Sequence, residues 1–306
     1  MNDGSTDKNA ALCDAWSQKD SRIHVLHQQN GGLSNARNAG LQLASSKFVA
    51  FADIDDFVHP QMYEVLHALA EKYALDMAAC AFDCVTERSV AFEQYDPAAL
   101  VETAEIFSGE QALSSFFEYY RALLRAPVWC KLYKTQLAKK IGFVEGRIHE
   151  DEFFFHRIVG SCKGIGKTSA VLYYYFQSPG SIVRSTYSLK RFDIVYAMRD
   201  RFFYFKASGI EGQTNAWGAY YIKKTLSVWH FVRKEHPELA DYYQAHCLKQ
   251  LDDDRDALLS CKLSPIVRLQ LQLLYHRPVL VDFLSYHLFA RALGKLKRLL
   301  QKSKKR

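Results

Sequence analysis

Apolar and polar positions follow two alternating periods along the first half of the chain. Short apolar runs predict buried β-strands at residues 23–26, 48–52, 76–82 and 170–176. Apolar residues at helical spacing predict helices at 5–18, 33–44, 62–73, 108–124, 134–140 and 150–159. Because strands and helices alternate, we expect an α/β fold with a mostly parallel sheet. In such sheets ligands bind beyond the carboxyl ends of the strands.

The pattern changes near residue 188. From there to the end helical periodicity dominates, and it is interrupted near Gly209, Pro237, Pro265 and Pro278. We therefore expect two domains, an α/β domain over residues 1–188 and a helical extension over residues 189–306.

Composition places the chain among globular proteins. Hydrophobic residues make up 49% of 306 residues, which is ample for a core. The seven cysteines form no Cys-x-x-Cys pair, which is typical of reduced thiols in a cytosolic protein. We expect no signal peptide, because the N-terminus is polar and acidic. The apolar run 279–290 is shorter than the ~20 residues that a membrane-spanning helix needs.

The net charge of +7 is concentrated at the C-terminal end. Residues 291–306 contain eight Lys or Arg and no acidic residue, which leaves 32 basic against 33 acidic residues elsewhere. A nucleic-acid-binding protein would spread its positive charge over a folded face. We therefore expect no nucleic-acid partner.

The same tail has the pattern of an amphipathic helix. Apolar residues recur at helical spacing and form one narrow stripe, namely Phe289, Leu293, Leu296 and Leu300. The basic residues lie off this stripe, which suits an anionic membrane surface. The alternative is a helix that docks on the protein and has a charged end.

Three aspartates directly follow the apolar run 48–52. Asp53, Asp55 and Asp56 would repel one another at the end of a strand, and a divalent cation relieves that repulsion. Mg²⁺ and Mn²⁺ prefer oxygen ligands, and Mg²⁺ sites often combine one or two carboxylates with substrate phosphates. The spacing therefore indicates a metal that carries a phosphorylated substrate. An Asp-rich turn that caps the next helix is the alternative.

Other polar segments accompany this cluster in a fixed order. Residues 2–7 read Asn-Asp-Gly-Ser-Thr-Asp, and residues 30–40 contain Asn-Ala-Arg-Asn-Ala-Gly. Further segments lie at 129–133, 149–154, 173–175 and 181–184. Over residues 1–190 this set resembles the bacterial family-two glycosyltransferases of the capsule and lipopolysaccharide type. Those proteins have a GT-A fold, which is Rossmann-like.

This resemblance implies an activity. The family's members are inverting, metal-dependent enzymes, so we expect a hexosyltransferase that uses Mn²⁺ or Mg²⁺ and a UDP-sugar donor. The acceptor would be a saccharide or a lipid-linked saccharide in cell-surface polysaccharide synthesis. The Gln-x-x-Arg-Trp sequence of processive synthases is absent, which favours the addition of single sugars. With the basic tail, this places the protein in the cytoplasm, peripheral at the inner face of a bacterial membrane.

The resemblance also assigns residues on the donor side. Asp55 is the best metal ligand, and Asp53 would face the metal or the ribose. Asp56 would orient the donor sugar, and Asp3 would lie near the nucleotide base or ribose. Arg184 would lie near phosphate.

On the acceptor side the resemblance assigns Asp151 as the general base, with Glu150 as an alternative base. Without the resemblance, these acids would merely complement a helix N-terminus. Arg37 would steady the pocket acids or approach the diphosphate. The alternative for Arg37 is an ordinary ion pair on a helix surface.

The start of the chain raises a second interpretation. Family members normally have a strand and a helix before the Asp-Gly-Ser segment, and here Met1 stands where the second strand should end. The expected GT-A domain is therefore N-terminally truncated. Either the gene start is misassigned, or the chain is a catalytically inactive fragment with at most a binding role.

Overall fold

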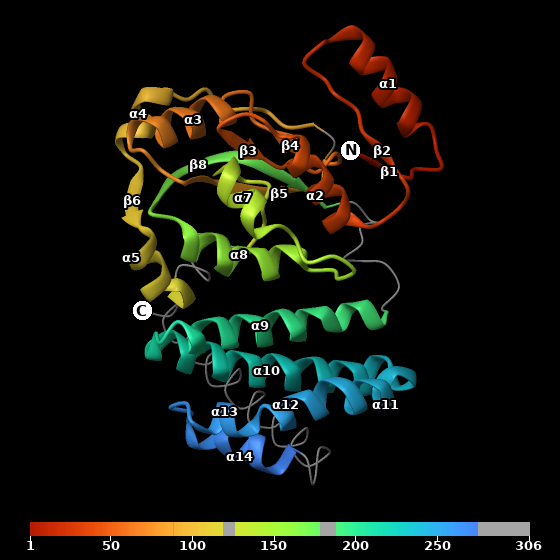
Figure 1. Cartoon of the computed structure of the whole chain (residues 1–306), viewed down its shortest axis with the longest axis vertical. Helices are drawn as coiled ribbons and strands as arrows, with labels where there is room; N and C mark the ends of the chain where they lie inside the picture. The colour runs from red at the N-terminus through yellow and green to blue at the C-terminus, as the bar shows by residue number, and fades with distance from the viewer. Residues whose placement is uncertain (88, 119–125, 178–187, 275–306) are drawn as a thin grey trace, which may run out of the picture. The chain divides into compact units, whose positions relative to one another are not determined.

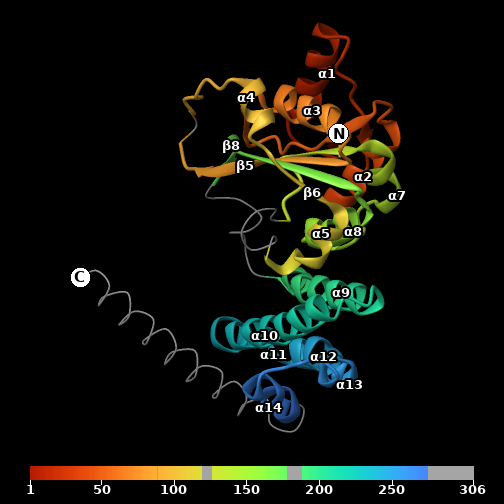
Figure 2. The ribbon, with the colours of Figure 1, turned by 90° about the vertical axis from the view of Figure 1, so that its left-hand side faces the viewer.

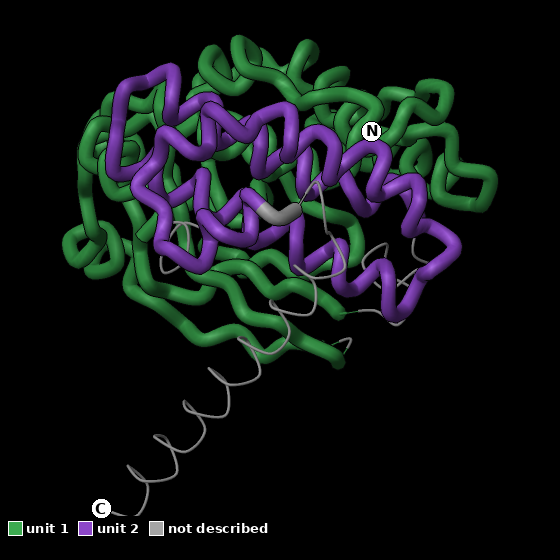
Figure 3. Tube along the Cα trace, turned by 90° about the horizontal axis from the view of Figure 1, so that it is seen from below, with its two compact units in different colours: residues 1–186 green, residues 187–306 purple. Residues whose placement is uncertain are grey.

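The computed structural model describes residues 1–87, 89–118, 126–177 and 188–274 (Figure 1). The chain divides into two compact units, unit 1 at residues 1–186 and unit 2 at residues 187–306 (Figure 3). The pattern of the sequence placed this boundary at residue 188. The basic tail, Pro278 and Arg184 lie outside the described residues.

Unit 1 is built around a six-stranded sheet in which β3-β7-β5-β8-β4 are neighbours and β6 also pairs with β8. The strands are β3 (Phe48–Ala50), β4 (Phe57–Val58), β5 (Met77–Val85), β6 (Glu105–Ser108), β7 (Lys131–Lys134) and β8 (Gly164–Phe176). Only β5 and β8 pair in parallel within this described sheet, and the other pairings are antiparallel. The sheet is therefore mixed and not mostly parallel, because all the antiparallel pairings involve β4, β6 or β7, three short strands that the apolar pattern did not predict.

A separate two-stranded parallel sheet joins β1 (Asn2–Asp3) to β2 (His27–Gln28). The strand expected at 23–26 is misplaced, because the pairing with β1 begins at His27. Between these strands lies α1 (Asn9–Lys19), which starts later than expected. Two residues before this helix, the Asp7 carboxylate accepts a hydrogen bond from the Asn9 N–H at 2.9 Å, and no side chain caps the helix at Lys8.

Helices cover both faces of the large sheet. They are α2 (Leu33–Leu43), α3 (Met62–Lys72), α4 (Pro97–Glu102), α5 (Gly109–Ser114), α7 (Thr135–Ile141) and α8 (Glu150–Ser161). Helix α3 lies over one face of the sheet and α8 over the other (Figures 1 and 2). The helix expected over 108–124 is described only in its first part, because residues 119–125 lie outside the described range.

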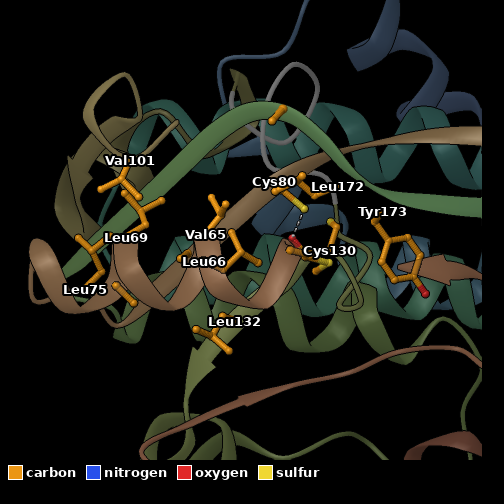
Figure 4. Packing of buried hydrophobic residues seen from close by; sticks show 14 of the residues in the cluster. Val65, Leu66, Leu69, Leu75, Cys80, Val101, Cys130, Leu132, Leu172 and Tyr173 are labelled. Atoms are coloured by element: carbon orange, nitrogen blue, oxygen red, sulfur yellow. Dashed lines mark hydrogen bonds between the residues drawn. The ribbon is translucent and has the colours of Figure 1, made fainter. Parts of the chain in front are cut away.

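The core of unit 1 lies between α3 and the sheet. Val65, Leu66 and Leu69 have no exposed surface, and they pack with Leu132 of β7 and Leu172 of β8 (Figure 4). Their spacing of one, three and four residues places them on one face of α3, as helical periodicity predicts. Burial of each such side chain stabilises the fold by about 1.5–3 kcal/mol, so this core holds the strands whose ends carry the acidic residues.

Unit 2 is helical throughout its described part. Its α-helices are α9 (Asp193–Ala207), α10 (Glu211–Glu235), α11 (Ala240–Tyr243), α12 (Lys249–Asp253), α13 (Arg255–Leu259) and α14 (Pro265–Leu274). Arg199 and Asp254 form a two-pronged ion pair at 2.6 and 2.8 Å, and the Tyr221 hydroxyl also donates to Asp254. No helix in the described residues is long and apolar enough to cross a membrane.

Candidate active site

The three aspartates lie in the turn that leads from β3 to β4. The Asp56 N–H donates to the Asp53 carbonyl at 3.2 Å and closes the turn. The Tyr173 hydroxyl donates to Asp56 Oδ2 at 2.7 Å and accepts from the Asp53 N–H at 3.2 Å. The Phe176 N–H donates to Asp56 Oδ1 at 2.8 Å. Strand β8 therefore fixes both ends of the turn.

The aspartates of this turn differ in their surroundings. Burial raises the pKa of Asp56, and the charges of Asp55 and Asp53 add to that rise, while the bonds from Tyr173 and Phe176 oppose it. Asp55 is exposed, and its carboxylate accepts no hydrogen bond from the described residues. Asp56 is thus held by the protein, whereas Asp55 is open to a ligand.

Asp53 and Asp55 are the carboxylates of this turn that a cation could contact. No cluster of three or more metal-ligating side chains occurs in the described part of the chain. Asp55 is open, and Arg37 contacts only Oδ1 of Asp53. The protein therefore offers one or two carboxylates, which is the number that Mg²⁺ sites take from the protein when phosphates complete the coordination.

Arg37 links the aspartate turn to helix α8. Its side chain, which is 9% exposed, donates from Nη2 to Asp53 Oδ1 at 3.0 Å and from Nη1 to Glu150 Oε1. The guanidinium also lies near the rings of Phe51 and Phe143, at 5.9 and 5.5 Å from their centres. Arg37 therefore lies among the acidic residues of the site. It does not form an ion pair on an exposed helix surface.

The acids expected at the start of α8 have different environments. Glu150 is buried and paired with Arg37. Asp151 is half-buried, and its Oδ1 accepts from the Glu152 N–H at 2.8 Å. Burial raises the pKa of Asp151 to about 7, and the charges of Glu152 and Glu150 contribute to that rise. Asp151 can therefore take up or release a proton near neutral pH.

Asp3 ends β1 and contacts the start of α2. Its carboxylate accepts from the N–H groups of Gly31 and Gly32 at 2.9 and 2.8 Å, and from Gln28 Nε2 at 2.7 Å. Burial raises the pKa of Asp3, but these hydrogen bonds outweigh it and hold the pKa below the usual value. Gly32 has a φ of 83°, which favours glycine and allows both N–H groups to face Asp3.

The sequence pattern gave no role to Tyr173. Tyr173 and Tyr175 alternate along β8 and both stack on Trp129, with ring centres 4.3 and 5.8 Å away. The period of two in the 173–175 segment was the signal that these rings share a face of the sheet. The pattern could not show that the Tyr173 hydroxyl reaches a turn more than a hundred residues earlier in the chain.

Comparison with known proteins finds glycosyltransferases that are similar to unit 1. Residues 1–139 match the sequence profile of glycosyl transferase family 2. The chain is 30% identical over 187 residues to the uncharacterized glycosyltransferase YibD of Escherichia coli, which covers 60% of this chain and 54% of YibD. Glycosyltransferase GlyG of Streptococcus pneumoniae is 29% identical over 192 residues, or 62% of this chain and 64% of GlyG. The matches thus span about half to two thirds of these relatives.

Solved structures with the same fold include TarS 1–349 of S. aureus. The complex of TarS with UDP-GlcNAc has a TM-score of 0.60 and 21% identity, and it covers 93% of this chain and 78% of that chain. The complex with UDP has a TM-score of 0.61 and 20% identity over the same shares. The expected GT-A fold with a helical C-terminal part is therefore confirmed.

Proposed function

We propose that the protein is an inverting, metal-dependent glycosyltransferase, because residues 1–139 match the profile of glycosyl transferase family 2. The donor is a UDP-sugar, and the acceptor is a saccharide or a lipid-linked saccharide in cell-surface polysaccharide synthesis. The bound UDP-GlcNAc and UDP in the TarS structures support this donor class.

One observation carries the proposal. Arg37 contacts Asp53 at the end of β3 and Glu150 at the start of α8. The Arg37 guanidinium therefore links the aspartate turn to Glu150, which is adjacent to Asp151 in the sequence. A transferase needs this arrangement, because the leaving diphosphate and the attacking acceptor lie on opposite sides of the transferred sugar.

On the donor side, Asp55 and Asp53 are the residues that would hold Mn²⁺ or Mg²⁺. The cation would neutralise charge that develops on the departing diphosphate. Asp56, fixed by Tyr173, holds the turn and orients the donor sugar. Asp3 binds the base or ribose, since its ionised carboxylate is an acceptor for N–H and O–H groups.

On the acceptor side, Asp151 is the general base rather than Glu150. Glu150 is occupied by Arg37, whereas the pKa of Asp151 is raised to about 7. A base with a pKa near the working pH removes a proton from an acceptor hydroxyl most efficiently. Asp151 therefore accepts that proton as the hydroxyl attacks the sugar.

The basic tail supports a peripheral location. Its eight Lys or Arg in residues 291–306 would bind anionic lipid headgroups at the inner face of the bacterial membrane. This location would bring the active site to lipid-linked acceptors.

The test is UDP release from a panel of UDP-sugars with MnCl₂ and mixed saccharide acceptors. We expect release by the wild-type chain and its loss in Asp55→Ala and in Asp151→Asn. Asp241→Asn, which changes an exposed aspartate of α11 in unit 2, is the matched control and should behave as wild type. Release that persists in both site variants would remove this mechanism.

A second candidate is a catalytically inactive protein with a binding role. It is favoured by α1, which buries none of its residues and leaves Leu12 and Trp16 57% and 53% exposed. Calorimetry with UDP, combined with the UDP-release assay, separates the candidates, because the second predicts nucleotide binding without turnover of any donor.

A further inference from the structure

The side chain of Asn35, in the first turn of α2, joins two distant parts of unit 1. Asn35 Oδ1 accepts from Gln28 Nε2 at 2.7 Å, and Asn35 Nδ2 donates to Glu145 Oε2 at 3.1 Å. The same Gln28 nitrogen donates to Asp3 Oδ1 at 2.7 Å. A continuous chain of hydrogen bonds therefore runs from Asp3 through Gln28 and Asn35 to Glu145.

Glu145 belongs to the segment 142–149, which connects α7 to α8. Asn38, one turn after Asn35, donates to Glu145 Oε1 and to the Phe143 carbonyl, both at 2.9 Å. It also accepts from the Phe143 N–H at 2.8 Å. Because residues three apart share a helix face, Asn35 and Asn38 hold the segment from one side of α2.

The orientation of the Asn35 amide is set by its partners. A carboxylate only accepts hydrogen bonds, so the Asn35 nitrogen must face Glu145 and its oxygen must face Gln28. The amide also needs the space left by glycine at position 31. A Cβ on Gly31 would lie 2.6 Å from Asn35 Oδ1.

Segment 142–149 contains three residues in the left-handed backbone conformation. Gly142, Gly146 and His149 have φ angles of 61°, 74° and 60°. A left-handed conformation at His149, directly before α8, is costly for a residue with a side chain. His149 directly precedes the first turn of α8, where Asp151 lies, so the conformation of the segment bears on the placement of that turn.

We propose that Asn35 is a positioning residue that fixes segment 142–149, and with it Asp151, to the donor side of the pocket at Asp3. Donor binding at Asp3 is thereby coupled to the placement of the base. The catalytic consequence rests on the proposed function, whereas the anchoring of the segment does not.

The test compares amide hydrogen exchange over residues 142–149 in the full chain and in Asn35→Asp, with and without UDP and MnCl₂. This change keeps the bond from Gln28 and places a second carboxylate against Glu145. Loss of one charge-assisted hydrogen bond should speed exchange of the segment about tenfold in the free protein. Asn215→Asp on α10 makes the same chemical change where the oxygen accepts from the Lys262 N–H, and it should leave the segment unchanged.

In the wild type, UDP with MnCl₂ should slow exchange of the segment, and Asn35→Asp should lose this protection. In steady-state assays Asn35→Asp should lower kcat about tenfold and leave the donor KM within about threefold, as expected for a lost positioning contact. Gly31→Ala, which displaces the Asn35 amide without a change of charge, should speed exchange of the same segment.

The inference is overturned if exchange over 142–149 is the same in wild type, Asn35→Asp and Gly31→Ala. It is also overturned if Asn35→Asp raises the donor KM and keeps kcat, because Asn35 would then be a donor contact. If the wild type fails to bind UDP, the proposed donor class is wrong, and exchange in the free proteins still decides the anchoring.

Discussion

Arg37 and Glu150 form a buried ion pair although 113 residues separate them in the sequence. The guanidinium also pairs with Asp53, so the Arg37 side chain lies between two carboxylates that belong to different elements, the turn after β3 and the start of α8. A buried pair of this kind is a weak source of net stability, but removing one partner leaves a buried charge without compensation. We therefore expect a larger loss of stability when only one partner of the ion pair is removed than when both are replaced.

Arg37→Met should lower the free energy of unfolding by about 3 kcal/mol, because Glu150 and Asp53 lose their shared cation. The free energy of unfolding of Arg37→Lys should lie between those of the wild type and Arg37→Met. A single ammonium does not match the planar guanidinium that reaches both carboxylates. Urea unfolding measures both. The double variant Arg37→Met with Glu150→Gln should lose less than the sum of the single changes, and strict additivity would contradict the pair.

The raised pKa of Asp151, about 7 in the fold against 3.8 for a free side chain, predicts a pH dependence of activity. A base must be ionised, so kcat/KM should rise with pH through about 7 and then level off. Asp151→Asn should lower the rate by about 10²–10⁴. A wild-type profile that is flat from pH 5.5 to 9 would argue against this base.

Stability should show the opposite trend from the same group. Between about pH 4 and pH 7 the fold retains a proton that the unfolded chain has lost, so this contribution is complete at low pH and is lost as pH rises through the folded pKa. Asp151→Asn should remove this downward slope from the stability profile measured by urea unfolding. If the slope of stability against pH is unchanged in the variant, that slope arises from another titrating group.

Several helices of unit 1 could be predicted closely from the sequence because their apolar stripes are regular. Helix α3 was expected at 62–73 and spans Met62–Lys72, and α8 was expected at 150–159 and spans Glu150–Ser161. The first strands were harder. β2 has only two residues and follows the apolar run at 23–26 instead of coinciding with it. The antiparallel pairings were missed because each of them involves β4, β6 or β7, and these short strands were not predicted from the sequence.

The candidate site was predictable as a set of residues but not as a network. Acidic residues at a strand end and a helix start carry local signals, namely their type and position. The partners of those residues carry none. Gln28, Glu145 and Tyr173 are ordinary polar residues in the sequence, and their roles arise only from contacts between segments that are far apart along the chain.

The basic tail should bind anionic membranes in the full chain. Sedimentation with vesicles of phosphatidylglycerol should carry the protein down, vesicles of phosphatidylcholine should not, and 0.5 M salt should release it, because screening weakens surface attraction. Replacing Lys295, Lys297 and Arg298 by Gln should weaken binding on the order of 100-fold, at about 1 kcal/mol per charge. A control variant replaces three exposed lysines outside the tail by Gln, namely Lys8, Lys19 and Lys223. Equal losses in both variants would contradict a role specific to the tail.

Tyr173→Phe should loosen the aspartate turn, because Asp56 Oδ2 loses its donor and the Asp53 N–H loses its acceptor. We expect a loss of about 1–2 kcal/mol in the free energy of unfolding and a higher MnCl₂ concentration for half-maximal UDP release. Tyr175→Phe is the matched control, since it removes a hydroxyl from the same strand and the same Trp129 stack. If both variants require the same MnCl₂ as wild type, Tyr173 does not hold the turn in a form that matters for metal binding.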